Sequence, residues 1–390
     1  MEKLNERLYS WASILEPQTR DQAYRTASLD IISPHVALMP DAHLGAGATV
    51  GSVIPTVRSI IPAAVGVDIG CGMIAVRTQW DADEFGAGRQ LSPLREAIEK
   101  TVPTGNRGGA NHEVYAAYTR ERIAQLEDTP GIKRAREVAP AWYLQLGSLG
   151  GGNHFIEISV DEEQRVWAFL HSGSRGVGNK LAQRHIRVAK QQCKVRNVRL
   201  PDPDLAWLDE AEPEFWAYIE DLEWAQQFAY LNRAEMMDRV LECLAEFMGA
   251  APERMDETNC HHNYSRQEEH FGQRVWLSRK GAILADKGTR GLIPGSMGTR
   301  SYVVKGKGCA MALNSAPHGA GRAYGRKAAR AAFTFAELEA AMAGIEWRRT
   351  DAFLDEIPQA YKDIDVVMRD AAELVEVEHT LRQVLNVKGD

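Results

Sequence analysis

The chain has 390 residues, of which 44% are hydrophobic and 25% charged, and its formal net charge is −7. This composition is that of a soluble globular protein, and the lack of any apolar run of 18 residues excludes a membrane-spanning helix. The five cysteines form no CxxC pair, which argues against a disulfide framework, and the start of the chain lacks an apolar signal segment. We therefore expect a reducing, cytoplasmic location and no membrane partner.

Charge is distributed unevenly along the chain. Residues 175–199 and 287–330 contain Lys and Arg but no acidic side chain, whereas residues 200–224 contain Asp and Glu but no basic one. The negative total argues against a protein that coats nucleic acid, but the two basic segments favour a local anionic partner. The alternative is that these segments are solvated helix faces, balanced by the acidic segment between them.

The spacing of apolar residues predicts both helices and short strands. Helical spacing predicts helices over 1–30, 92–100, 112–128, 179–196 and 215–248, and an alanine-rich helix that ends near residue 333. Short apolar runs predict strands over 36–39, 153–158 and 166–170, and a hairpin-like pair over 274–277 and 282–285.

A glycine-rich turn over residues 66–73 contains the first candidate site. It places Asp68 and Cys71 three residues apart, among glycines that let the backbone approach a bound group closely. A thiolate and a carboxylate repel each other at short range unless a cation lies between them. The turn therefore indicates a metal site, and the alternative is a tight turn with an inert buried cysteine.

Histidines further along the chain favour the metal interpretation. His154 follows three consecutive glycines, on a strand whose alternation puts Asn153 and Glu157 on one face and His154 on the other. His171 ends a buried strand, which is a common position for catalytic groups in α/β folds.

Other polar residues allow more than one interpretation. Of the neighbours His261 and His262 at most one is expected to face the metals, and Cys260 is interpreted as structural. Asp41 and His43 share a strand face, where they could orient metal ligands from behind or simply cap a turn.

Two later stretches are typical of anion binding. The glycine-punctuated loop 291–301 offers backbone N–H groups that can wrap a phosphate or a base. His318 precedes the alanine-rich helix, so we expect it beside a helix N-terminus, where an anion is favoured. A neutral imidazole there could attack phosphorus, and the alternative is an ordinary turn histidine.

Nine stretches together resemble the RtcB family of RNA-splicing ligases. In chain order they are PDAHLG, GATVGSVIPT, GVDIGCGM, LGGGNHFIEI, LHSGSRGVGN, NCHHNY, IPGSMGTRSYV, HGAGR and HTLRQVLNVKG. The resemblance runs from about residue 36 to the end of the chain and is looser between 200 and 255. One glycine motif would be weak support, but nine in the family's order are specific.

The resemblance implies one α+β domain over residues 1–390, with mixed and antiparallel sheets around a central dimetal site. It implies two manganese ions per chain, one bound by Asp68, Cys71 and His154 and the other by Cys71, His171 and His262. Thiolate and imidazole ligands alone would favour zinc or iron, so manganese follows from the family and not from the residues.

The resemblance also implies a GTP site and a nucleophile. His318 would attack the α-phosphate of GTP and carry GMP as a covalent adduct. The implied nucleotide pocket comprises Asn153, His154, Phe155, Ile156, Glu157, His262, Asn263, Pro294, Gly295, Ser296, Met297, Ser301, His318, Gly319, Ala320, Gly321 and Lys388.

The implied reaction joins an RNA 3′-phosphate or 2′,3′-cyclic phosphate end to a 5′-hydroxyl end, in RNA repair or tRNA splicing. The RNA is expected along Arg175, Arg300 and Arg322, and the participation of an activating or repair protein stays open. Ala46, Pro317 and Tyr324-Gly325 depart from the usual family pattern, so a divergent RNA-repair paralogue is one alternative. Others are a non-catalytic subunit that keeps the fold and a phosphodiesterase that only opens cyclic phosphates.

Overall fold

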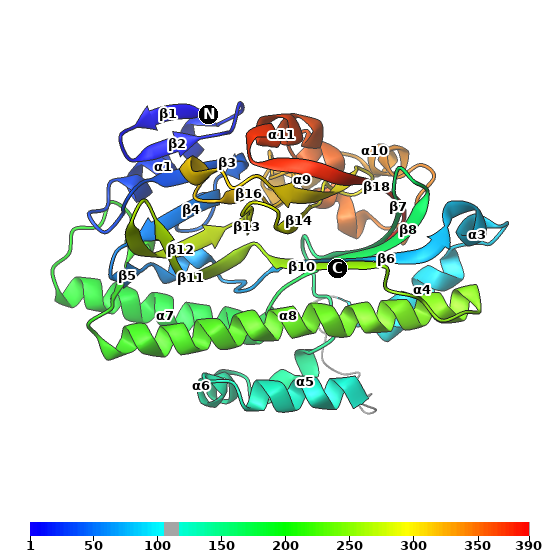
Figure 1. Ribbon diagram of the computed structural model, residues 1–390, viewed down its shortest axis with the longest axis horizontal. Helices are drawn as coiled ribbons and strands as arrows, with labels where there is room; N and C mark the ends of the chain where they lie inside the picture. Colours follow the sequence, from blue (N-terminus) through cyan, green and yellow to red (C-terminus); the bar gives the residue numbers. More distant parts are fainter. Residues whose placement is uncertain (105–116, 390) are drawn as a thin grey trace.

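The computed structural model describes residues 1–104 and 117–389. Two sheets lie side by side above a layer of long helices (Figure 1). The first is mixed, because β2 and β3 run parallel while its other pairs are antiparallel. Its strands are, in spatial order, β1 (Glu2–Asn5), β2 (Leu8–Ser10), β3 (Val36–His43), β4 (Val50–Thr56), β12 (Gln273–Lys280) and β11 (Asn263–His270).

The second sheet is larger and draws its strands from distant parts of the chain. Its order is β10 (Asp256–His261), β6 (Gly72–Asp81), β8 (Arg165–Ser172), β7 (Phe155–Val160), β18 (Val375–Lys388), β15 (Ser301–Gly306) and β14 (Arg290–Ile293), with β17 (Glu346–Trp347) parallel to β18. The sheet curls until its edge strands β10 and β14 meet, and Arg290 pairs with Asp256 across them. Two small pairs complete the strands, β13 (Ala282–Leu284) with β16 (Ser315–Pro317) and β5 (Ser59–Ile60) with β9 (Leu208–Asp209).

The helix α8 (Pro213–Met248) is the longest element of the described chain and runs beneath both sheets (Figure 1). It starts with a proline in its first turn and ends at Gly249, whose positive φ of 71° closes the helix. Beside it lies α7 (Arg175–Val195), and α5 (Ala117–Glu127) and α6 (Ile132–Val138) cover its far side. Because α8 is covered on several sides, apolar residues occur around much of its circumference.

The remaining helices are short and lie mostly at the periphery. They are α1 (Pro17–Ala27), α2 (Pro62–Val65), α3 (Ala82–Gly86), α4 (Ser92–Thr101), α9 (Arg326–Ala332), α10 (Phe335–Ala341) and α11 (Ile364–Asp370). In the described ranges, no helix has both the length and the apolar composition needed to cross a bilayer.

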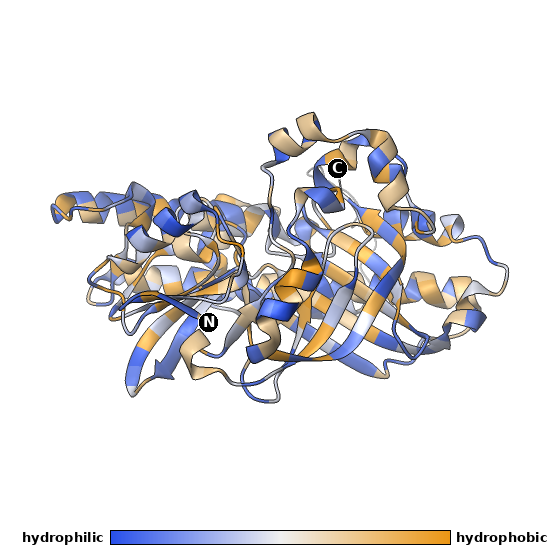
Figure 2. Cartoon of the chain, turned by 90° about the horizontal axis from the view of Figure 1, so that it is seen from above, coloured by the Kyte–Doolittle hydropathy of each residue, from blue (hydrophilic) through white to orange (hydrophobic). Residues whose placement is uncertain are grey.

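One hydrophobic core joins the two sheets. Met39 and Val53 from the smaller sheet pack in the same cluster as Met73, Phe169 and Ile293 from the larger one. In Figure 2 hydrophobic residues are concentrated in these strands and in the helix faces that cover them. This shared core and the mixed sheets confirm the predicted single-domain α+β fold.

The helix predicted over residues 1–30 is wrong for its first half. The chain there forms β1 and β2, and helix starts only at Pro17. Leu4, Leu8 and Trp11 have helix-like spacing, but residues 8–10 pair with β3, and Leu8 and Ser10 are buried there. Pairing with a distant strand has overridden the local pattern.

The predicted hairpin over 274–277 and 282–285 is also wrong, although both strands exist. Gly281 alone separates β12 from β13, so the chain has no room to turn back on itself. β12 pairs with β4 and β11, and β13 pairs with β16. The helices predicted at 92–100 and 215–248 are confirmed within two residues at each end. The helix predicted over 112–128 is described only from Ala117, and its earlier residues lie outside the described ranges.

Candidate active site

The turn between α2 and β6 carries Asp68 and Cys71. Its backbone is held by the Cys71 N–H, which donates to Asp68 O at 3.2 Å. At Gly72 an added Cβ would lie 2.0 Å from the carbonyl oxygen of Cys260, so only glycine lets β10 pass this closely. The approach of β10 carries His262, the residue after its end, to the Cys71 side chain.

The five candidate metal ligands lie together, although they come from residues 68 to 262. Cys71 Sγ lies 3.4 Å from His154 Nε2 and 3.2 Å from His171 Nε2. His154 Nε2 is 3.0 Å from Asp68 Oδ2, and His171 Nε2 is 2.8 Å from His262 Nε2. The ligand atoms form two groups that share Cys71.

Backbone carbonyls orient two of these imidazoles. His154 Nδ1 lies 2.9 Å from Leu149 O, and His171 Nδ1 lies 3.2 Å from Asn153 O. A carbonyl only accepts hydrogen bonds, so each Nδ1 carries the proton and each Nε2 directs its lone pair into the cluster. A thiol, a carboxylate and several imidazole nitrogens thus converge on one buried volume, and this donor set fits metal ions.

Burial keeps the imidazoles in the form that binds metal. It lowers the pKa values of His171 and His262, and neighbouring imidazoles lower them further, so both rings stay neutral. Burial and the Asp68 charge raise the pKa of the Cys71 thiol, which a bound cation would reverse. Burial alone would raise the pKa of Asp68, but the interactions with His154, Cys71 and Arg175 together outweigh burial and lower it.

The neighbours His261 and His262 diverge, as strand alternation predicts. His261 Nδ1 lies 2.8 Å from Gly70 O and 3.1 Å from Arg233 Nη2, on the side away from the Cys71 cluster. Cys260 packs against the hydrophobic core that joins the sheets.

His318 does not precede a helix, so that expectation is wrong. The chain after it forms bends and one isolated bridge between Arg322 and Tyr361, Ala323 N donates to Ala360 O, and α9 begins only at Arg326. Gly321 has φ +71°, and a Cβ there would lie 2.3 Å from Asp41 O, so the loop packs directly on β3.

The backbone N–H groups at His318, which were expected to bind an anion, bind the side chain of Asp41 instead. The backbone N–H groups of His318 and Gly319 donate to Asp41 Oδ2 at 3.1 and 3.2 Å. The same oxygen lies 2.6 Å from His318 Nδ1. Asp41 therefore orients His318 and none of the clustered imidazoles, and the His318 ring centroid lies 4.6 Å from that of His262.

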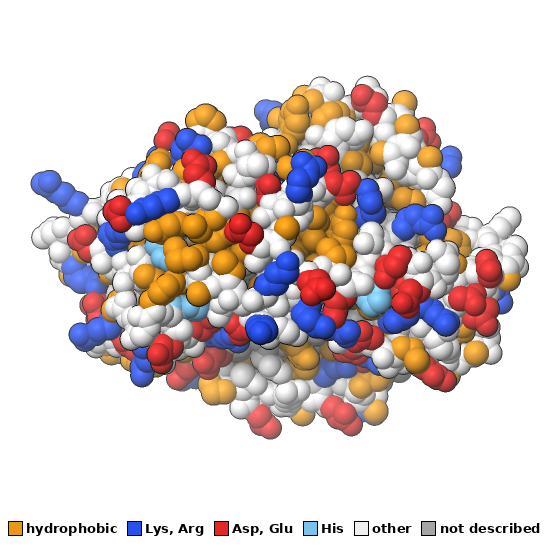
Figure 3. Space-filling view, turned by 45° about the horizontal axis from the view of Figure 1, so that its top comes forward, with side chains coloured by type: hydrophobic (Ala, Val, Ile, Leu, Met, Phe, Trp, Pro, Cys, Tyr) orange, Lys and Arg blue, Asp and Glu red, His pale blue; other side chains and the backbone are white. Residues whose placement is uncertain are grey.

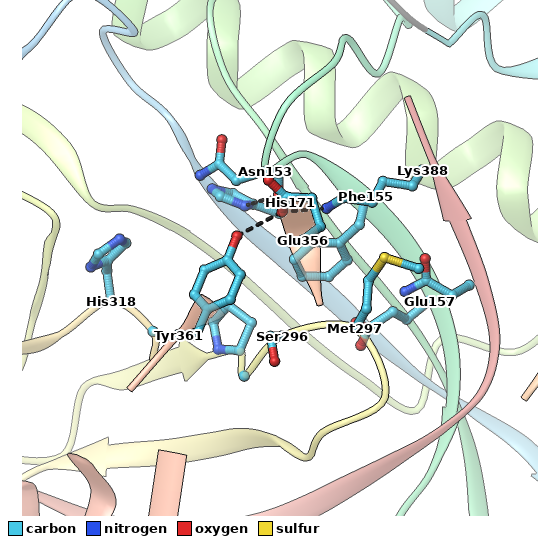
Figure 4. A pocket seen from close by; sticks show the side chains of 14 residues that line it. Asn153, Phe155, Glu157, His171, Ser296, Met297, His318, Glu356, Tyr361 and Lys388 are labelled. Carbon is cyan, nitrogen blue, oxygen red and sulfur yellow. Dashed lines mark hydrogen bonds and ion pairs between the residues drawn. The ribbon is translucent and has the colours of Figure 1, made fainter. Parts of the chain in front are cut away.

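A pocket extends from His318 between the loop after β14 and strands β7 and β18 (Figure 4). Figure 4 shows His318 at one end of the view and Glu157 and Met297 at the other. The pocket is lined by Asn153, Phe155, Glu157, His171, Pro294, Gly295, Ser296, Met297, His318, Gly319, Glu356, Tyr361, Asn386 and Lys388.

Most of the predicted nucleotide residues line this pocket, but some lie elsewhere. Ile156 points into the core on the other face of β7, and Ser301 reaches the pocket through a 3.3 Å hydrogen bond to Glu157. His154 and His262 belong to the Cys71 cluster. Asn263, Ala320 and Gly321 are absent from the pocket lining given by the described residues.

Sequence reasoning missed Glu356, Tyr361 and Asn386. Glu356 Oε2 accepts hydrogen bonds from Tyr361 OH at 2.6 Å and from Lys388 Nζ at 2.9 Å. Burial opposes the charge of Glu356, but Lys388 and Arg326 hold its pKa below the ordinary value. These residues carry no glycine or histidine signal in the sequence, so only their positions in the fold identify them.

The pKa of Glu157 is shifted in the opposite direction from that of Glu356. Burial raises the pKa of Glu157 to about 8, although the Ser301 hydrogen bond and the Lys388 charge oppose the change. A buried carboxyl group with so perturbed a pKa, inside a pocket, is a typical mark of a functional site.

The three arginines predicted to bind RNA differ in accessibility. Arg175 is largely turned inward, with Nε donating to Ser148 Oγ at 3.2 Å. Arg322 donates to Glu356, to Tyr361 OH and to Asp355 O at 2.8–3.1 Å. Arg300 is exposed and pairs with Asp365 at 2.8 Å. On the face shown in Figure 3, Lys and Arg side chains alternate with Asp and Glu and form no continuous basic surface.

The α+β fold places a buried Cys–His–Asp cluster beside a polar pocket, with a carboxylate-oriented histidine between them. These features define a candidate metalloenzyme. Residues 22–389 match the sequence model of a family described as tRNA-splicing ligase RtcB, and the chain belongs to this family. It is 43% identical over 391 residues to an RNA-splicing ligase RtcB of Escherichia coli strain K12, covering 96% of this chain and 95% of the relative.

Further relatives have lower sequence identity but also align over nearly the whole of both chains. A tRNA-splicing ligase RtcB of Pyrobaculum aerophilum is 29% identical over 456 residues, covering 98% of this chain and 94% of the relative. The RNA-splicing ligase RtcB2 of Escherichia coli strain ATCC 25922 is 30% identical over 402 residues, covering 96% and 93%.

Proposed function

We propose that this protein is a GTP- and manganese-dependent RNA ligase that joins 3′-phosphate or 2′,3′-cyclic phosphate ends to 5′-hydroxyl ends. The family description and the names of the relatives support an RNA ligase. The observation that carries the finer proposal is the placement of His318, an imidazole oriented by Asp41 between a pocket and a metal-capable cluster.

The proposed first step is guanylylation of His318. Asp41 Oδ2 lies 2.6 Å from Nδ1 and would hold the proton on that nitrogen, so that Nε2 keeps the lone pair that attacks the α-phosphorus of GTP. An N–P bond forms, the bond between the α-phosphorus and the bridging oxygen breaks, and pyrophosphate leaves.

The two later steps return the histidine and seal the RNA. An oxygen of the RNA 3′-phosphate attacks the phosphorus of the histidine adduct, which frees His318 and activates the RNA end with GMP. The 5′-hydroxyl then attacks the RNA 3′-phosphorus and loses its proton, and GMP leaves. A 2′,3′-cyclic phosphate must first be opened by water to a 3′-phosphate.

The proposed metal ligands are the two groups that share Cys71. Asp68, Cys71 and His154 would hold one ion and Cys71, His171 and His262 the other. Bound manganese would supply positive charge to the phosphoryl oxygens on which negative charge develops.

The proposed nucleotide site is the pocket that ends at His318. Phe155 and Tyr361 offer apolar faces to a base, and Glu157 and Lys388 offer an acceptor and a donor. The base would lie near Glu157, because the phosphates must reach His318 at the other end (Figure 4).

Labelled GTP tests the proposal. Incubation of the protein with manganese and GTP labelled in the α-phosphate should yield one acid-labile GMP adduct, and mass spectrometry should place it on His318. The substitution His318→Ala should abolish both the adduct and ligation of a 3′-phosphate end. It should still allow joining of RNA whose 3′ end already carries GMP, since that step needs no nucleophilic histidine.

The matched control is His379→Ala, because His379 lies on β18 and contacts Glu162 far from the pocket lining. This variant should label like the wild-type protein. An adduct that persists in His318→Ala, or that maps to Lys388, would contradict the proposed nucleophile.

A further inference from the structure

Asn386 presents a buried hydrogen-bond acceptor to the pocket. It lies on β18 directly opposite Glu157 on β7, and its side chain lines the same pocket. The residue is only 2% exposed, and its Oδ1 has no hydrogen-bond partner among the described residues. A buried polar atom without a partner is unfavourable, so its position inside a ligand pocket calls for a donor from the ligand.

The orientation of the Asn386 amide follows from its neighbour Gln383. Gln383 Nε2 donates to the carbonyl oxygens of Ser296 and Thr299 at 2.9 and 2.8 Å. The Gln383 amide is therefore oriented with its Oε1 toward Asn386. The N–H of Gly298 also donates to this Oε1, at 3.3 Å. Asn386 must therefore direct its Nδ2 at Gln383 Oε1, at 3.2 Å, and the Oδ1 remains for the pocket.

The polar groups around Asn386 match one nucleobase better than the others. Glu157 and Asn386 offer neighbouring acceptors, and Lys388 offers a donor two residues along β18. Guanine is the common base whose edge carries two adjacent N–H donors, at N1 and N2, next to an acceptor, O6. Adenine lacks the second donor, and the pyrimidines present one donor group each on that edge.

We propose that Asn386 is a specificity-determining residue whose Oδ1 accepts a hydrogen bond from the exocyclic N2 amine of guanine. This inference rests on the proposed function, because it assumes that the pocket binds the base of GTP. Asn386 acts together with Glu157, whose carboxyl oxygen accepts the hydrogen bond from the N1–H group of guanine. Loss of the Asn386 acceptor therefore weakens binding of a base that has the N2 amine and leaves a base without it unaffected.

Inosine triphosphate separates this role from a general contribution to the pocket. It keeps the N1–H, O6 and triphosphate of GTP and lacks only the N2 amine. Calorimetric titration of the full-length protein with GTP, inosine triphosphate and ATP should show tighter binding of GTP than of inosine triphosphate, by roughly tenfold or more.

In Asn386→Leu, which keeps the approximate size of the side chain, the ratio of GTP to inosine triphosphate affinity should fall close to one. The change should come from weaker GTP binding. Asn386→Ala provides the same readout if the leucine variant does not fold, and thermal unfolding monitors both. The control is Glu376→Ala, on the exposed part of the same strand, which should keep the wild-type ratio.

The outcomes separate this inference from the proposed function. If Asn386→Leu and Asn386→Ala bind GTP and keep the wild-type ratio, Glu157 alone reads the amine and the role of Asn386 is overturned. If the wild-type protein binds neither GTP nor inosine triphosphate, the nucleotide site itself is overturned, and with it the proposed function.

Discussion

At the scale of single residues, Glu157 is a carboxylic acid whose charged form the fold disfavours. Its pKa in the folded protein is about 8, compared with an ordinary value of 4.5, because burial outweighs the hydrogen bond from Ser301 and the charge of Lys388. Between these two pH values the unfolded chain has lost this proton and the folded chain keeps it. Proton binding therefore favours folding below pH 4.5, and this contribution is lost as the pH rises to 8.

We predict that Glu157→Gln removes this pH dependence. The wild-type free energy of unfolding should decrease relative to that of the variant, by up to about 1.4 kcal/mol per pH unit between pH 5 and 8. Denaturant titrations of both proteins across this range measure the difference. Parallel curves for the two proteins would mean that Glu157 is already ionised in the folded state.

Asp41 and His318 show how a residue can acquire a role from a distant part of the chain. Asp41 lies 277 positions before His318, yet its Oδ2 accepts two backbone N–H groups and lies beside the imidazole. The arrangement needs no helix dipole. A carboxylate that holds Nδ1–H leaves Nε2 as the free nitrogen, which is the form that a nucleophilic histidine requires.

At the scale of elements, α8 supports the candidate metal site from behind. Arg233 on this helix is fully buried and donates to Gly70 O at 2.8 Å and to Ser172 O at 3.1 Å. These carbonyls belong to the residues next to Cys71 and His171. The preceding residue, Asn232, accepts from Gly147 N at 2.7 Å, so the same turn of α8 also holds the loop before β7.

We predict that Arg233→Met destabilises the protein by about 2–5 kcal/mol, because it leaves buried carbonyl groups without donors. It should also reduce the bound manganese, since the Cys71 turn loses its support. Thermal unfolding and metal analysis by mass spectrometry measure the two effects. Arg254→Met is the control, because the Arg254 side chain is 36% exposed and its loss should cost less than about 1 kcal/mol. Full metal content in a destabilised Arg233→Met protein would show that α8 supports the fold but not the site.

At the scale of the whole molecule, the strand nearest the end of the described chain lies in the interior of the larger sheet. β18 pairs with β7 on one side and β15 on the other, and Leu381 and Leu385 are fully buried. The pocket residues Asn386 and Lys388 belong to this strand. The sheet and the pocket can therefore be completed only after residues 375–389 have joined strands from the first half of the chain.

We predict that a chain truncated after Leu374 does not fold cooperatively. The truncation removes β18 and so exposes the core faces of β7 and β15. Circular dichroism during heating should show no sharp transition. Deletion of residues 2–5 is the control, since β1 is an edge strand with mostly exposed side chains, and this variant should unfold cooperatively. A truncated chain with a wild-type transition would contradict a single cooperative domain.

Much of this molecule was determined by local sequence. The glycines around Cys71 and the helical periodicity of residues 215–248 each operate within a few residues, and the structure agrees with them. The alternation predicted at 153–157 puts Asn153 and Glu157 on the pocket side as expected, although the strand itself begins only at Phe155. The motif pattern pointed to five metal-ligand candidates, and the fold brings all five together. Whether they hold manganese stays a prediction.

Tertiary structure alone decided the features that depend on partners far along the chain. Residues 2–5 and 8–10 form strands because β2 pairs with β3 and β1 pairs with β2. His318 stands in a non-helical loop because residues 360–361 and Asp41 hold it there. The pocket roles of Glu356, Tyr361 and Asn386 arise in the same way. Periodicity reports only which face of an element is apolar, whereas each of these features depends on which other element covers that face, and no short window of sequence contains that information.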